Sequence, residues 1–172
     1  MKKITLPLIK ETATTLKAGD CVLISGTVFT ARDYAHKRLF ELLDSNKKLP
    51  FEIKGAVIYY AGPCTSKPNT ISGSCGPTTS ARMNAYAPRL LDLGLGAIIG
   101  KGEMSEEVRN AIMRNKSIYF AAIGGAGALY ANCIINSQCM AFDDLLSEAI
   151  YKLEVKDFPV IVAYDAFGDS VY

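Results

Sequence analysis

Short apolar runs and segments of helical periodicity alternate along this chain. Four runs rich in β-branched or aromatic residues are typical of buried strands: residues 21–28, 55–63, 96–102 and 117–125. Between them, apolar residues recur at the spacing of a helix. This order of elements predicts an α/β fold with a partly parallel central sheet. The alternating tail, residues 151–172, predicts an antiparallel part.

Capping and turn residues mark the expected helix boundaries. Thr30 is placed to cap a helix over the periodic segment that follows it. Ser105 is placed to cap a second helix, whose first turn carries two glutamates. Pro88 fits the first turn of a third helix, and Gly94 is placed to end it. The sequence DAFGDS near the end of the chain predicts a hairpin turn.

Length and charge limit the class of protein. The 172 residues, without a repeat or a linker, predict a single domain over 1–172. The net charge of +2 is too even for a nucleic-acid-binding protein. No apolar run approaches the roughly 20 residues of a membrane helix, and the first residues lack a signal peptide. We therefore expect a soluble, cytoplasmic protein, whose 49% hydrophobic content indicates a buried partner surface.

The cysteines are odd in number and irregular in spacing. They are Cys21, Cys64, Cys75, Cys133 and Cys139, with no C-x-x-C pair. This pattern predicts that the chain alone ligates no metal, neither in a zinc site nor in a complete iron–sulfur site. A reduced chain is the simplest interpretation.

Three turns that follow predicted strands carry basic or hydroxyl side chains beside glycine. Their candidate residues are Arg32, Asp33 and His36 in the first, Gly76, Thr78, Thr79 and Arg82 in the second, and Lys101 in the third. Ligands of α/β sheets usually bind where strands end, so we expect these turns to meet. Two guanidiniums and an ammonium suit a small dianion such as a dicarboxylate.

Each of these turns also has a purely structural interpretation. A helix that starts at Thr78 or Thr79 would place Thr78 and Arg82 on one face and direct backbone N–H groups at an anion. Alternatively, a threonine only caps the helix and Arg82 is solvated. His36, the only histidine, is either a proton-transfer group or a hydrogen-bonded structural residue. Lys101 is either an anion ligand or an ordinary turn lysine.

The motifs resemble those of a known family in order and spacing. They are SGTVFTARDYAHKR, YYAGP, SCGPTTSARM, LGLGAIIGKG, FAAIGGAGAL and KLEVKDFPV. Together they resemble the β subunit of class I iron–sulfur fumarate hydratases, which is also the C-terminal part of single-chain enzymes. They are similar as well to the β subunit of L-tartrate dehydratase. The resemblance covers about residue 3 to residue 172.

The resemblance implies a swivelling β/β/α three-layer domain and a hydro-lyase that interconverts L-malate and fumarate. It also implies an α subunit that ligates a [4Fe–4S] cluster through three cysteines, with the open iron acting as a Lewis acid. The assembled enzyme is expected to be a dimer of αβ units. The β subunit alone is expected to bind no iron and to be inactive.

Residue roles also follow from the resemblance. It implies that Thr78 is the catalytic base, with Lys101 near it, and that Arg32 and Arg82 bind substrate carboxylates. His36 is a rival acid–base group, because a threonine hydroxyl becomes a base only beside cations in a site without water. The remaining candidates, Asp33, Gly76 and Thr79, are expected to support the site.

Two further functions remain open at this stage. YYAGP and KLEVKDFPV favour the fumarase branch. Asn84, however, stands where many fumarase relatives carry an acidic residue, which leaves tartrate or another hydroxy-dicarboxylate as substrate. A third hypothesis is a non-catalytic dicarboxylate-binding or assembly subunit. The joint presence of Arg32, Thr78, Arg82 and Lys101 argues against it.

Overall fold

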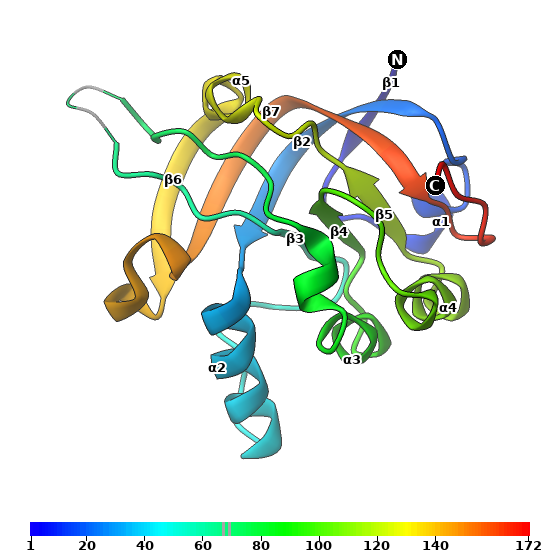
Figure 1. Ribbon diagram of the computed structural model, residues 1–172, viewed down its shortest axis with the longest axis horizontal. Coiled ribbons are helices and arrows are strands. Elements are labelled where there is room, and N and C mark those ends of the chain that lie inside the picture. Colours follow the sequence, from blue (N-terminus) through cyan, green and yellow to red (C-terminus); the bar gives the residue numbers. More distant parts are fainter. Residues whose placement is uncertain (67, 69) are drawn as a thin grey trace.

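A computed structural model describes residues 1–66, 68 and 70–172 and contains one mixed sheet (Figure 1). Seven strands form it: β1 (Lys2–Thr5), β2 (Cys21–Thr30), β3 (Val57–Tyr59), β4 (Ala97–Gly100), β5 (Ile118–Ala121), β6 (Ile134–Ala141) and β7 (Ile150–Tyr164). Their order is β1-β2-β3-β4-β5-β7-β6. Because β2 also pairs with β7, the sheet closes into a barrel of five strands: β2, β3, β4, β5 and β7.

Both strand directions occur in this sheet. The neighbours from β1 to β5 run parallel, whereas β7 is antiparallel to β2, β5 and β6. The prediction of an α/β fold with a partly parallel sheet and an antiparallel part is therefore confirmed. Closure of the sheet was not predicted.

Side-chain alternation along the barrel strands separates two apolar cores. On β3, Val57 and Tyr59 belong to a cluster that all five barrel strands share, so this cluster fills the barrel. The neighbouring Ile58 belongs to a second cluster, which the helices cover. Both faces of β3, β4 and β5 are thus buried, which explains why these strands are continuous apolar runs in the sequence.

The helices are short and lie mostly outside the barrel (Figure 1). They are α1 (Lys10–Ala13), α2 (Asp33–Asp44), α3 (Ala87–Asp92), α4 (Glu106–Asn115) and α5 (Gly127–Asn132), with the 3₁₀ helices η1 (Ser80–Met83) and η2 (Asp143–Glu148). Helices α2, α3 and α4 supply the outer core. The predicted cap is confirmed at α4, where Ser105 Oγ accepts from the N–H of Val108. Pro88 lies in the first turn of α3, and Gly94 follows its end with a φ of 105°.

The predicted cap at Thr30 is wrong. Thr30 is the last residue of β2, and its hydroxyl lies 3.3 Å from the carbonyl of Ala149 and 3.0 Å from the N–H of Tyr151. Helix α2 begins at Asp33, three residues later. The hydroxyl thus satisfies backbone groups at the start of β7 instead of a helix end.

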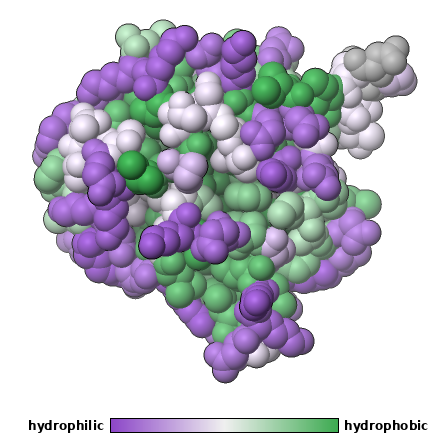
Figure 2. All heavy atoms as spheres, turned by 180° about the vertical axis from the view of Figure 1, so that it is seen from behind, coloured by the Kyte–Doolittle hydropathy of each residue, from purple (hydrophilic) through white to green (hydrophobic). Residues whose placement is uncertain are grey.

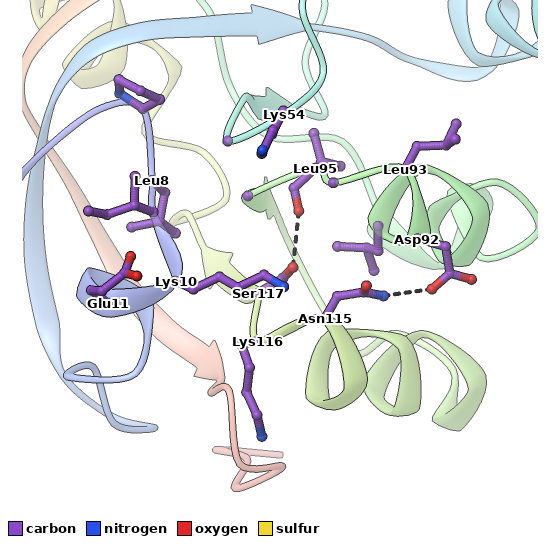
Figure 3. A pocket seen from close by; sticks show the side chains of 16 residues that line it. Leu8, Lys10, Glu11, Lys54, Asp92, Leu93, Leu95, Asn115, Lys116 and Ser117 are labelled. Atoms are coloured by element: carbon purple, nitrogen blue, oxygen red, sulfur yellow. Dashed lines mark hydrogen bonds between the residues drawn. The ribbon is translucent and has the colours of Figure 1, made fainter.

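A cavity of about 660 Å³ opens at the amino ends of β4 and β5 (Figure 3). Leu8, Lys54, Leu95 and Ser117 are among its lining residues. None of the candidate residues from the three turns lines this cavity. No helix in the described part of the chain is both long enough and apolar enough to cross a membrane.

Gly100, the last residue of β4, allows η1 to approach the sheet. A Cβ at this position would overlap Ser80 Oγ and lie 3.1 Å from Tyr60 Cδ2. Ser80 Oγ accepts from the N–H of Lys101 at 2.9 Å and shares a 2.9 Å hydrogen bond with the Tyr119 hydroxyl. The missing side chain at residue 100 therefore lets Ser80 join η1 to the end of β4.

We predict that Gly100→Ala lowers the free energy of unfolding by about 1–3 kcal/mol, because Ser80 must move and its hydrogen bonds are lost. The matched control is Gly76→Ala, where the nearest atom would lie 3.5 Å from the new Cβ. This control should stay within about 1 kcal/mol of wild type. Urea unfolding followed by circular dichroism measures both, and equal midpoints would contradict the packing argument.

Candidate functional site

The three turns meet at the carboxyl edge of the parallel strands. Arg32 follows β2, and Lys101 follows β4 directly. The segment from Thr78 to Arg82 lies across the ends of β3 and β4: the Thr78 N–H donates to the Tyr60 carbonyl at 2.6 Å, and the Ser80 N–H donates to the Lys101 carbonyl at 2.9 Å. Thr79 forms a parallel bridge with Lys101. The turns thus lie together, as expected.

No α-helix starts at Thr78 or Thr79. Thr79 precedes the four-residue 3₁₀ helix η1 without a side-chain capping bond, and Thr78 lies one residue further out. The predicted shared helix face for Thr78 and Arg82 is therefore wrong, as is the predicted anion site at a helix N-terminus. The segment is too short for an α-helix because Ser80 is already bonded to β4 on one side and α3 begins at Ala87 on the other.

Arg82 is held by a carboxylate. Its Nε lies 3.1 Å from Asp33 Oδ1 and its Nη2 lies 2.7 Å from Oδ2, a bidentate pair. Nη1 makes no hydrogen bond to a residue that the structure describes. Asp33 thus occupies the Nε side of the guanidinium and leaves the edge formed by Nη1 and Nη2 for a ligand, with half of the side chain exposed (51%).

Lys101 lies beside the turn that follows β5. A Cβ at Gly124 would lie 3.3 Å from Lys101 Cδ and 3.8 Å from its Nζ, so the glycine gives the lysine chain its room. The ammonium forms no ion pair with any residue in the described part of the chain. Of the three candidate cations, all in the described part of the chain, Lys101 is the one without a carboxylate partner, since Arg82 pairs with Asp33 and Arg32 lies 3.9 Å from Glu148.

His36 is buried in the outer core. Its Nδ1 lies 2.8 Å from the carbonyl of Arg32, so Nδ1 carries the proton, and its Nε2 has no partner among the described residues. The rings of Tyr60 and Tyr86 lie 5.3 and 5.4 Å from the imidazole. Burial lowers the pKa of His36 to about 4, against the opposing effects of the Arg32 carbonyl and Asp33. The imidazole is therefore neutral at pH 7, and no contact joins it to Thr78, Arg82 or Lys101.

The described residues do not provide a metal-binding group. No three histidine, cysteine or carboxylate side chains among them converge where they could hold a metal ion. Cys75 is buried, and burial raises the pKa of its thiol to about 12, whereas Cys21, Cys64 and Cys139 are exposed. The described residues of this chain therefore do not fit an iron–sulfur cluster.

Comparison with known proteins identifies the family. Residues 1–172 match the family model described as Fumarase C-terminus. The chain is 43% identical to a putative L(+)-tartrate dehydratase subunit beta of Methanocaldococcus jannaschii, over 96% of this chain and 88% of that one. It is 40% identical to the anaerobic class I fumarate hydratase of Escherichia coli, over 87% of this chain and 28% of that one. The chain belongs to the Fumarase C-terminus family.

Relatives of this Fumarase C-terminus chain differ in length. Fumarate hydratase 2 of Leishmania major is 36% identical over 95% of this chain, which spans 29% of that protein. The chain thus spans less than a third of these fumarate hydratases but most of the tartrate dehydratase subunit.

Sequence reasoning missed two residues of the site. In the sequence, Ser80 stands among residues with more obvious functional side chains. Its role follows only from Gly100, which lies next to it in the folded chain. Glu148 follows the acidic pair Asp143 and Asp144, which are exposed, and nothing in the sequence distinguishes it from them. Its place beside Arg32 depends on the long return of the chain from β6 to β7.

We predict that stability falls as pH drops from 7 to 5. The folded pKa of His36 is about 4 and the ordinary value is about 6.5, so the unfolded chain binds more protons between these values and stability is lost as pH falls through this window. The loss between pH 7 and pH 5 should be about 2 kcal/mol. Urea unfolding at both pH values measures it, and His36→Leu should remove most of the difference. A native His36 that titrates near pH 6.5 by NMR would contradict the buried, neutral state.

Proposed function

We propose that this chain is the β subunit of a hydro-lyase that interconverts L-malate and fumarate together with an α-type subunit. The observation that carries the proposal is the group of Arg32, Thr78, Arg82 and Lys101 at one edge of the sheet. Relatives named fumarate hydratase and tartrate dehydratase support dehydration of a hydroxy-dicarboxylate.

In this proposal the two arginines bind the two carboxylates of the substrate. Arg82 offers its Nη1–Nη2 edge to one of them, since Asp33 holds the other side of the guanidinium. Arg32 binds the second carboxylate. Asp33 is thus a supporting residue, as are Thr79, which bridges to Lys101, and Gly76, which packs on α5.

Thr78 is the proposed base. Dehydration of malate breaks one C–H bond and one C–O bond, forms the C=C bond of fumarate and releases water. The Thr78 alkoxide takes the proton from carbon and returns it to the departing hydroxide as water. The Lys101 ammonium, which the family resemblance puts near Thr78, would favour the charged form of the hydroxyl. His36 stays the rival base, but its burial favours Thr78, because a base must reach the proton that it removes.

The proposal also assigns the [4Fe–4S] cluster to the α subunit, where it would serve as a Lewis acid. The chain would act as one domain, residues 1–172, a swivelling β/β/α module that closes over its partner in a dimer of αβ units. Large exposed apolar side chains support a covered surface: Tyr34, Ile71, Ile123, Leu129 and Leu146 are each at least half exposed. Apolar side chains also reach the surface between polar ones on the face in Figure 2.

Tartrate is the second candidate substrate. The tartrate dehydratase subunit of M. jannaschii is 43% identical and similar in length to this chain. Asn84 does not discriminate between the substrates, because its side-chain Oδ1 accepts from the N–H of Ser105 at 3.1 Å, at the start of α4. The amide thus has a structural partner away from the arginines.

Anaerobic co-expression with an α-type subunit tests the proposal. The assembled complex should hydrate fumarate and dehydrate L-malate, and the isolated chain should be colourless and inactive. Turnover of a tartrate alone would move the assignment to the second candidate. A complex that binds dicarboxylates without turning over malate, fumarate or either tartrate would make the chain a binding or assembly subunit.

We predict that Thr78→Ala lowers kcat of the assembled enzyme by at least about 100-fold with little change in KM, since the hydroxyl acts on the reacting proton. The matched variant Thr78→Ser keeps the hydroxyl and should retain part of the activity. Steady-state kinetics with malate compares both with His36→Asn, after gel filtration has shown that each variant assembles. A larger loss in His36→Asn than in Thr78→Ala would transfer the role of base to the histidine.

A further inference from the structure

Arg32 and Glu148 face one another across a short distance. Arg32 Nε lies 3.9 Å from Glu148 Oε1. Both atoms are buried, and neither has a hydrogen-bond partner among the residues that the structure describes. Opposite charges without other partners attract strongly at such a site, because an unpaired buried charge is costly. The remaining exposure of Arg32, 27% of its side chain, lies on atoms other than Nε.

The segment that carries Glu148 is fastened to the turn that carries Arg32. At one end of η2, Arg38 binds Asp144 through both terminal nitrogens, and Nη1 lies 2.9 Å from Oδ1. Beyond its other end, the Ala149 carbonyl accepts from the Thr30 hydroxyl at 3.3 Å. Glu148 is therefore held beside the β2–α2 turn from both sides.

Gly62 also lies against the Arg32 side chain and the end of η2. A Cβ at this position would lie 2.6 Å from the Ser147 carbonyl and 3.2 Å from Arg32 Cδ. The Arg32 side chain thus runs between the chain at residue 62, which follows β3, and the end of η2. This passage limits the directions in which the guanidinium can point.

We propose that Glu148 is a positioning residue that holds Arg32 by its Nε and directs the terminal nitrogens at a substrate carboxylate. The inference rests on the proposed function, in which Arg32 binds the substrate. Asp33 also lies on the Nε side of Arg82, where it forms two hydrogen bonds, whereas Glu148 is an ion-pair partner of Arg32 without a hydrogen bond. The site would thus present two guanidiniums, each backed by a carboxylate and each free at its terminal edge, to the two ends of a dicarboxylate.

Kinetics of the assembled enzyme tests this role. Glu148→Gln keeps the size of the side chain, and kcat/KM for malate should fall by about 10- to 100-fold. In an Arg32→Ala background the same substitution should change kcat/KM less than about 2-fold, since Glu148 acts through Arg32. The matched control, Asp143→Asn, removes an exposed carboxylate of η2 that does not hold the segment, and it should stay within about 3-fold of wild type.

A second readout needs no activity. The Nε–H signal of Arg32, assigned with Arg32→Lys in ¹⁵N NMR spectra of the full chain, should exchange slowly with water in wild type and Asp143→Asn, because the negative charge of Glu148, 3.9 Å away, repels the hydroxide that catalyses exchange. It should exchange fast in Glu148→Gln. If the wild-type complex has no dehydratase activity, the proposed function is wrong. The NMR comparison still tests whether Glu148 acts on Arg32. Slow exchange that persists in Glu148→Gln, equal kinetic losses in the two carboxylate variants, or additive losses with Arg32→Ala would each overturn the role of Glu148.

Discussion

The antiparallel pairing of β2 with β7 is the constraint on which the rest of the structure depends. It joins the parallel strands into a closed sheet, because β7 also pairs with β5. Gly26 makes the junction possible: it lies at a register shift of β2 with a φ of 124°, and a Cβ there would lie 3.0 Å from Leu6 Cβ. Before this residue β2 pairs with β1, and after it with β3. A single strand thus serves three neighbours.

Closure determines where the charged groups lie. The parallel strands β2 to β5 all end at the same edge, so Arg32 and Lys101 are placed by their position after a strand. Arg82 is placed differently, through Ser80, whose hydroxyl binds the backbone N–H of Lys101. One strand-end lysine therefore fixes the 3₁₀ turn that carries the second arginine. The carboxylates Asp33 and Glu148 then lie beside the two guanidiniums and balance their positive charges.

Most of the core could be predicted from the sequence, because strands buried on both faces are continuous apolar runs. Strand β6 could not, since its sequence IINSQCMA, which is mostly exposed, lacks both an apolar run and a strict alternation. The turn at Thr78 was predicted as a site but with the wrong helix, because the hydrogen bonds that stop it come from β4, far away in sequence. Burial of His36 depends on Tyr60 and Tyr86, from two other segments. Glu148 depends on the return from β6 to β7. Contacts of this kind have no local signal.

On the proposed function, the charges at this edge of the chain do not balance the two negative charges of the substrate. Arg32, Arg82 and Lys101 carry three positive charges, and Asp33 with Glu148 carries two negative ones, which leaves a net charge of +1. A dicarboxylate brings two negative charges. Binding would therefore leave one negative charge without a counterion in a closed site, where such a charge is costly. On the proposed function, a cation outside these five residues would balance this charge, and the surface of the α-type subunit that covers this edge is the proposed source.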